Sequence, residues 1–316
     1  MERTQELAII RRAYAKQILA QAQVDDPRVE LAFTEVRRED FLGPGPWVIP
    51  RWFEPWRCEY VPTPSADPVY LYIDTVVQVV AERHLNNGQP SGHARWIASA
   101  SIKPSEHVVH IGTNTGYYTA IMSHLAGPSG KVTGIEIDAS LAARAKENLS
   151  SYPNVLIVEG DGTSVPFEAA DVIYVNAGVA RPVDSWLERL REGGRLILPL
   201  TIMAEGSTNV TRGVVFRIER RMPRYLAQWI CPVAIIPCEG ARDETSEAAL
   251  AEAFRQDLSR QGGGHHPPSR PGITIEVPAR IDKKGDYKGV TRLYRHEDIP
   301  DDRCWLRGSG WCLAYD

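Results

Sequence analysis

From His107 to Gly127 the chain reads HVVHIGTNTGYYTAIMSHLAG, in which a short apolar run leads into a glycine-containing turn and then into a helix-like stretch. Apolar runs and helix-like stretches keep alternating downstream, in KVTGIEI (131–137), SLAARAKENLSSY (140–152) and NVLIVEG (154–160). The rhythm continues through DVIYVNA to RLILPL (195–200). Because βαβ units build a parallel sheet with helices on both faces, we predict an α/β, Rossmann-like domain with a mostly parallel, doubly wound sheet.

The flanking sequence predicts three regions. Residues 1–100 are expected to hold N-terminal helices, residues 101–240 the cofactor-binding domain, and residues 241–316 a C-terminal extension. The stretch 43–68 is rich in proline and tryptophan and is expected to be an irregular covering segment, because proline removes backbone donors. In the extension, GGGHHPPSRPG (262–272) is typical of a linker or mobile loop.

Composition narrows the class of protein. The formal charge is −4, from 36 basic and 40 acidic residues, which gives no reason to expect binding along a nucleic-acid backbone. We expect a soluble, cytoplasmic protein with neither a nucleic-acid nor a membrane partner, since no apolar run is long enough to span a membrane and no signal-peptide core is seen. The five scattered cysteines are typical of reduced thiols and form no metal-binding motif.

The turn after the first strand is predicted to hold a nucleotide cofactor. Gly112 and Gly116 stand where a backbone approaches a ligand, and Asn114 tolerates the left-handed backbone of such a turn. A dinucleotide-binding fingerprint would have its third glycine where this chain has Tyr117. An NAD site is therefore disfavoured, and an adenosyl group without a pyrophosphate is favoured.

Two acids follow at the ends of the next two strands. Glu136 ends the second strand, where a carboxylate can hold a ribose diol. Asp161 stands between two glycines after the third strand and can accept a hydrogen bond from an adenine amino group. The order and spacing of the turn and the two acids predict one cofactor site at the carboxyl edge of the sheet.

The cofactor turn HIGTNTGY (110–117) is one of several recognisable stretches. The others are VRREDF (36–41), EGDG (159–162), VNAG (175–178) with Pro182, and GGRLILP (193–199). Together they resemble the protein-L-isoaspartate (D-aspartate) O-methyltransferase family, whose motifs include E-I-G-T-G-S-G-Y and V-P-R-x-x-F. The likeness runs over about residues 8–240, and the chain is similar to a divergent member with an N-terminal insertion and a C-terminal extension.

The resemblance implies a class I methyltransferase fold, S-adenosyl-L-methionine as the methyl donor and a carboxylate as the acceptor. It also implies that His110 lies near the methionine end of the donor, where the family has an acid. The expected cofactor contacts are His110, Gly112, Thr113, Asn114, Gly116, Tyr117, Glu136, Ile137, Asp161, Gly162 and Asn176.

The acceptor site is expected at residues 87–93, NGQPSGH, which correspond to the family's G-Q-T-I-S-Q-P. Ser91 is the match to the motif's serine, and together with Gln89 it would hold the acceptor oxygen by hydrogen bonding. His93 is a candidate general base for a hydroxyl or amine acceptor. By themselves these residues also fit an ordinary turn with a surface histidine.

We therefore expect an S-adenosyl-L-methionine-dependent O-methyltransferase that acts on the carboxylate of a peptide, a protein or a small molecule. A carboxyl group has a pKa near ~4 and is ionised at neutral pH, so it needs no general base. The alternatives are a dedicated carboxyl methyltransferase of one peptide or small natural product, an NAD-dependent oxidoreductase and a non-catalytic binding protein. The C-terminal extension is expected to select the acceptor together with aromatic side chains, namely Trp47, Trp52, Phe53 and Trp56.

Overall fold

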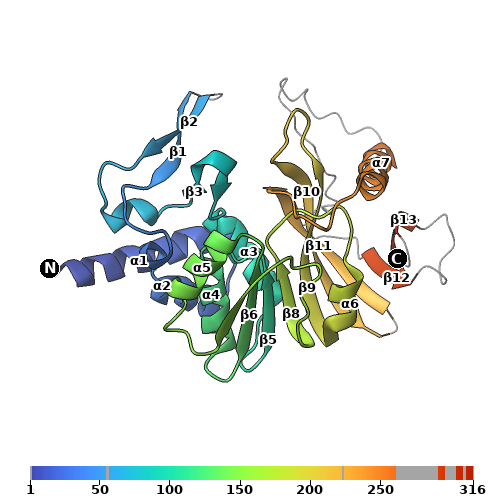
Figure 1. Ribbon diagram of the computed structural model, residues 1–316, viewed down its shortest axis with the longest axis horizontal. Coiled ribbons are helices and arrows are strands. Elements are labelled where there is room, and N and C mark those ends of the chain that lie inside the picture. Colours follow the sequence, from blue (N-terminus) through green and yellow to red (C-terminus); the bar gives the residue numbers. More distant parts are fainter. Residues whose placement is uncertain are drawn as a thin grey trace. The chain divides into compact units, whose positions relative to one another are not determined.

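The computed structural model describes residues 2–54, 57–222, 224–260, 291–295, 304–308 and 311–315. Figure 1 traces the chain from its N-terminus in blue to its C-terminus in red. The chain divides into two compact units, Met1–Val165 and Pro166–Asp316. The boundaries predicted near residues 100 and 240 do not coincide with this division and stay predictions.

Among its described residues the first unit carries five α-helices, two small hairpins and three parallel strands, which Figure 1 labels in part. Its helices are α1 (Arg3–Ala22), α2 (Pro27–Glu35), α3 (Pro90–Ala100), α4 (Tyr117–Ala126) and α5 (Ala139–Asn148), with 3-10 turns at Arg38–Phe41, Pro68–Leu71 and Ala81–Arg83. Its strands are β1 (Val48–Glu54), β2 (Arg57–Pro62), β3 (Gln78–Val80), β4 (Leu85–Asn86), β5 (His107–Ile111), β6 (Lys131–Glu136) and β7 (Val155–Glu159). Strand β6 pairs parallel with both β5 and β7, which confirms the predicted βαβαβ order.

Local signals account for most of these elements. All five residues of β5 are buried, as expected of a parallel strand that is covered on both faces. Helix α2 begins at Pro27 and is capped by Asp26, and α5 is capped by Asp138. Helix α4 differs, because its N-cap is Gly116 and no side chain caps it. An uncapped helix start of this kind is suited to a polar ligand.

The proline- and tryptophan-rich stretch 43–68 was predicted to be irregular, and this prediction is wrong. It contains the antiparallel hairpin of β1 and β2, in which Pro50 pairs with Tyr60. A two-stranded sheet has two free edges, so a proline can lie in a strand without removing a ladder hydrogen bond.

The aromatic side chains that were predicted to select the acceptor fall into two groups. Trp52 and Phe53 on β1 are 67% and 51% exposed, and Tyr60 on β2, which was not among the predicted residues, is 47% exposed. Trp47 is buried in a small hydrophobic cluster, so it supports the fold rather than a substrate surface. Trp56 lies outside the described residues, as does most of the C-terminal extension beyond α7.

The second unit is built on one sheet with two α-helices among its described residues, α6 (Asp184–Arg189) and α7 (Glu244–Arg260). In spatial order its strands are β13 (Cys304–Gly308), β14 (Trp311–Tyr315), β12 (Thr291–Arg295), β11 (Arg224–Ile235), β10 (Thr211–Arg221), β9 (Leu190–Met203) and β8 (Ala170–Val175). Strands β8 and β9 pair parallel, and the remaining neighbours pair antiparallel. The predicted strand RLILPL lies within β9.

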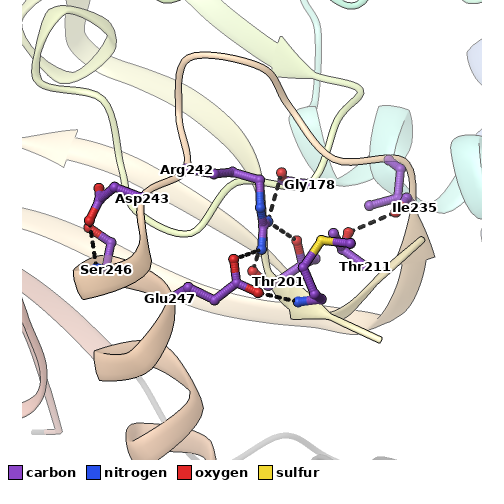
Figure 2. A network of polar contacts seen from close by, with 9 residues as sticks. Gly178, Thr201, Thr211, Ile235, Arg242, Asp243, Ser246 and Glu247 are labelled. Atoms are coloured by element: carbon purple, nitrogen blue, oxygen red, sulfur yellow. Dashed lines mark hydrogen bonds and ion pairs between the residues drawn. The ribbon is translucent and has the colours of Figure 1, made fainter. Parts of the chain in front are cut away.

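Arg242, just before α7, ties that helix to the sheet of the second unit (Figure 2). Its guanidinium donates to the carbonyl oxygens of Gly178 at 3.1 Å and Thr201 at 3.0 Å, and it forms an ion pair with Glu247 at 2.6 Å. Glu247 also accepts a hydrogen bond from the amide of Met203 at 2.5 Å. The network holds the loop that follows β8 against β9.

Three further observations concern the described part of the chain. None of its helices is both long and apolar enough to cross a membrane. No group of three or more His, Cys, Asp and Glu side chains there is arranged to hold a metal ion. Cys58 on β2 is an exposed, free cysteine.

Candidate functional site

The turn between β5 and α4 has the backbone that its sequence predicts. Gly112 (φ 79°), Asn114 (φ 54°) and Gly116 (φ 98°) all adopt the left-handed region. A β-carbon at Gly116 would lie 2.7 Å from Leu149 Cδ1, so this position requires glycine for steric as well as conformational reasons. The amide of Gly112 donates to the carbonyl oxygen of Ile135 at 2.9 Å, which ties the turn to β6.

Glu136, the predicted ribose ligand, ends β6 beside this turn. Its Oε2 accepts a hydrogen bond from the amide of Asn114 at 2.6 Å, and its Oε1 accepts one from the amide of Asp138 at 3.1 Å. The residue is only 6% exposed, and burial raises the pKa of its carboxyl group while the amide hydrogen bonds oppose that rise. A carboxylate oxygen accepts more than one hydrogen bond, so Glu136 can orient the turn and still accept from a diol.

Three more of the predicted cofactor residues, Ile137, Asp161 and Gly162, lie just after β6 and β7. Ile137 is 46% exposed directly after β6. Asp161 accepts hydrogen bonds from the amide of Thr163 at 2.8 Å and from its hydroxyl at 2.7 Å, which fixes the turn after β7. A β-carbon at Gly162 would lie 2.5 Å from Ile111 Cγ2, so this turn packs directly on the end of β5. The three strand ends therefore bring these residues to one edge of the parallel sheet.

Three of the predicted cofactor residues, Thr113, His110 and Tyr117, have side chains that are buried, and the Thr113 hydroxyl donates to the carbonyl oxygen of Ile135 at 3.3 Å. His110 is fully buried, its Nδ1 lies 2.8 Å from Thr119 Oγ1, and burial lowers the pKa of the imidazole to about 3. A neutral imidazole cannot replace the negative charge that the resemblance implies at this position. Tyr117 is 2% exposed and packs against Phe33 and Phe41, with ring centroids 6.3 and 5.7 Å apart. Only the backbone of Tyr117, and not its side chain, can therefore contact a cofactor.

Asn176, the remaining predicted cofactor residue, follows β8 in the second unit. It belongs to the VNAG stretch, in which a β-carbon at Gly178 would lie 2.3 Å from Thr211 Oγ1 and 2.4 Å from Thr201 Oγ1. The glycine of this stretch is thus explained by close packing of the loop on β9 and β10. Contact of Asn176 with a cofactor stays a prediction.

The predicted acceptor segment, residues 87–93, leads into the start of a helix and is not the ordinary turn that its sequence also fitted. Helix α3 begins at Pro90, a position that suits proline because the first helical amide has no intrahelical partner. Ser91 Oγ donates to Asp74 Oδ2 at 2.7 Å, and the Ser91 amide donates to Asp74 Oδ1 at 2.8 Å. Gln89 Nε2 donates to Asp74 Oδ2 at 3.0 Å. The structure therefore brings Ser91 and Gln89 together around a carboxylate.

His93, the candidate general base, lies inside the protein, so the alternative of a surface histidine is wrong. It is 3% exposed, and its ring stacks on Tyr118 with centroids 3.6 Å apart and an interplanar angle of 9°. Burial, together with His110 and Arg38 nearby, lowers the pKa of His93 well below its ordinary value. This geometry assigns the imidazole a packing role, and its role as a base stays a prediction.

Gly88 precedes α3 and packs closely against His93. Gly88 has φ 79°, and a β-carbon there would lie 2.2 Å from His93 Nε2. His93 therefore fills the space that a side chain at position 88 would need, and the next hydroxyl along the chain is that of Ser91.

Arg38, from the VRREDF stretch, fixes the backbone on both sides of Asp74. Its guanidinium is fully buried and donates to the carbonyl oxygens of Leu71 and Thr75, both at 2.6 Å. A longer bond of 3.4 Å reaches Asn87 Oδ1. Sequence reasoning missed both Arg38 and Asp74 as site residues. The VRREDF stretch was the available signal for Arg38, and no motif marked Asp74.

Comparison with known proteins identifies the family. Residues 54–221 match the family model described as Protein-L-isoaspartate(D-aspartate) O-methyltransferase (PCMT). A protein-L-isoaspartate O-methyltransferase of Thermotoga maritima is 30% identical over 66% of this chain, and the match spans 57% of that protein's length. A protein of the same name from Ignicoccus hospitalis is 30% identical over 52% of this chain and 77% of its own length.

Two solved structures share the fold. A protein-L-isoaspartate O-methyltransferase has a TM-score of 0.57 at 23% identity, over 96% of this chain and 88% of its own. A putative protein-L-isoaspartate O-methyltransferase from Plasmodium falciparum, in complex with S-adenosyl-L-homocysteine, has a TM-score of 0.54 at 18% identity, over 72% of this chain and 98% of its own. The predicted class I, Rossmann-like fold is thus confirmed. Because the family model matches more than half of its residues, the chain belongs to the protein-L-isoaspartate(D-aspartate) O-methyltransferase family.

Proposed function

We propose that this chain transfers the methyl group of S-adenosyl-L-methionine to a carboxylate oxygen of a peptide or protein. The observation that carries the proposal is the convergence of the Gly112 turn, Glu136 and Asp161 at the carboxyl edge of β5, β6 and β7. Rossmann-like folds bind nucleotide cofactors at this edge. Family membership supports a carboxylate as the acceptor.

Each part of the donor has a matching group on this edge. Glu136 would accept hydrogen bonds from the ribose diol, and Asp161 would accept one from the adenine amino group. The exposed side chain of Ile137 offers an apolar surface to the adenine ring. The backbone from Gly112 to Gly116 and the uncapped start of α4 would receive the methionine end.

The reaction depends on placement more than on proton transfer. A carboxylate oxygen attacks the methyl carbon as the carbon–sulfur bond breaks, which leaves a methyl ester and S-adenosyl-L-homocysteine. The positive sulfonium and the negative carboxylate neutralise each other, so a dry pocket and an in-line approach favour the step. No proton has to be removed, which is compatible with the neutral, buried states of His93 and His110.

Replacing Glu136 with alanine is expected to weaken donor binding by about 2 kcal/mol, roughly 30-fold, because a charge-assisted hydrogen bond to the donor and the anchor of the turn are lost together. Titration calorimetry with S-adenosyl-L-methionine measures the change. Glu159→Ala is the matched control, since Glu159 pairs with Glu136 in the β6–β7 ladder but is exposed. Equal affinities for the wild type and Glu136→Ala would remove Glu136 from the donor site.

Labelled donor and a panel of carboxyl acceptors are expected to yield a base-labile methyl ester. An isoaspartyl peptide is the first acceptor to include, because the relatives are named protein-L-isoaspartate O-methyltransferases. Ser91→Ala is expected to slow turnover about 10-fold, as for the loss of one hydrogen bond, without changing donor affinity. Ser99→Ala on the same helix is the control, because Ser99 Oγ donates to the carbonyl of Arg95. A base-stable product, such as an N-methyl amine, would refute the ester.

The exposed hairpin favours one variant of this function, a methyltransferase dedicated to a single peptide. Trp52, Phe53 and Tyr60 offer large apolar area with few rotatable bonds, and such side chains are frequent anchors in peptide and protein interfaces. A response to one peptide alone within the acceptor panel would support this variant. A response to many isoaspartyl sequences would support a general protein methyltransferase instead.

A further inference from the structure

In the predicted acceptor segment, Ser91 and Gln89 already bind a carboxylate, which is the side chain of Asp74 in the same chain. Three donors converge on Asp74, namely the amide of Ser91 at 2.8 Å, the hydroxyl of Ser91 at 2.7 Å and the side-chain amide of Gln89 at 3.0 Å. Ser91 and Gln89 are the residues predicted from the sequence to hold the acceptor oxygen by hydrogen bonding. We name these three donors of Ser91 and Gln89 at the start of α3 the carboxylate cradle. In this structure the side chain of Asp74 occupies it.

A serine hydroxyl can donate only one hydrogen bond, so the bond to Asp74 decides whether Ser91 can donate to an acceptor. A hydroxyl has one proton, and Ser91 gives that proton to Asp74. While the bond lasts, Ser91 Oγ offers only lone pairs, and it cannot donate to a second carboxylate. Two carboxylates at hydrogen-bond distance from the same donors also repel each other. An acceptor and Asp74 therefore exclude one another from the cradle.

The surroundings allow Asp74 to leave the cradle without a movement of the backbone. Arg38 holds the carbonyls of Leu71 and Thr75, so the chain on either side of Asp74 is fixed. The Asp74 side chain itself is only partly buried, and none of the ion pairs among the described residues involves it. A rotation about its side-chain bonds can move the carboxylate into water.

We propose that Asp74 is a specificity-determining residue that acts as an internal competitor of the acceptor carboxylate. The side chain of Asp74 fills the cradle in the absence of substrate, and an acceptor binds only by displacing it. Simple carboxylates, which bring no other contacts, are thereby excluded, whereas a peptide with further contacts outcompetes the internal group. The inference rests on the proposed function, because it takes the Ser91 and Gln89 donors as the site of the acceptor.

Asp74→Ala is expected to lower the KM for a methylated peptide at least 10-fold and to leave the affinity for S-adenosyl-L-methionine unchanged. The same variant, saturated with S-adenosyl-L-homocysteine, is expected to bind acetate at least 10-fold more tightly than the wild type when followed by NMR titration. Asp74→Asn keeps the size of the side chain, removes the charge, and is expected to give the same direction with a smaller change. It also serves if the alanine variant fails to fold.

The matched control is Asp26→Ala, because Asp26 caps α2 by accepting from the amides of Arg28 and Val29, whereas Asp74 accepts from one amide at the start of α3. This variant should change stability alone. Two results would refute the proposal that Asp74 competes with the acceptor: an unchanged or raised KM in both Asp74 variants, or a lower kcat without tighter acetate binding. Asp74 would then be a residue that positions Ser91. If the Asp74 variants bind acetate more tightly but no acceptor yields an ester, Asp74 does block a carboxylate site, and the proposed function is refuted.

Discussion

Replacing Arg38 with methionine is expected to lower the free energy of unfolding by about 3 kcal/mol. Methionine has a similar length, but it leaves the buried carbonyls of Leu71 and Thr75 without their donor, and each unsatisfied buried group costs about 1–3 kcal/mol. Removal of the buried charge offsets part of this cost. Equilibrium unfolding in urea, followed by tryptophan fluorescence and circular dichroism, measures the change.

The neighbouring arginine provides the control for this substitution. Arg37 has a side chain that is 57% exposed and forms an ion pair with Asp40 at 2.7 Å. Arg37→Met is expected to change stability by at most about 0.5 kcal/mol, since exposed ion pairs contribute little. Equal losses in the two variants would show that Arg38 contributes no more than a surface charge does. Arg38→Lys should lie between them, because one ammonium group cannot reproduce the planar fork of donors.

Acidification from pH 7 to pH 4 is expected to destabilise the protein through His110 by about 3 kcal/mol. The pKa of this imidazole is about 3 in the folded state because of burial, and its ordinary value is 6.5. Below pH 6.5 the unfolded chain therefore binds a proton that the folded chain rejects. Stability is lost as the pH falls from about 6.5 towards 3, and the loss is complete only below the folded pKa.

The variant that tests this is His110→Asn, whose unfolding free energy should depend less steeply on pH than that of the wild type. The comparison uses urea unfolding at pH 7 and pH 4, so that a constant loss from altered packing cancels. His124→Asn is the control, because His124 lies on α4 and is exposed. The assignment fails if His110→Asn and the wild type lose the same stability over this range. His93, whose pKa is also lowered by burial, accounts for part of the remaining pH dependence.

The sheet edge that is proposed to bind the donor was largely predictable from the sequence because its signals are local. Apolar runs of strand length, turn glycines and strand-end acids each act within a few residues, and together they predicted β5, β6 and β7 with the turn at Gly112. The left-handed backbone at Asn114 followed from the same turn. Local signals were misleading in the stretch 43–68. Its prolines predicted a loop, but proline is also tolerated in the edge strands of a two-stranded hairpin, which is what the stretch contains.

The sequence by itself thus determined the parallel order of β5, β6 and β7 and the residues at their ends. Only the tertiary structure decided the contacts around Ser91 and Asp74, because these contacts join residues that are distant along the chain. Asp74 reaches Ser91 across 17 residues, and Arg38 reaches the backbone of Thr75 across 37. The same holds for the buried state of His93, since Tyr118 covers it from another helix. A side chain's charge and exposure depend on the neighbours that folding brings to it, and no local pattern in the sequence records them.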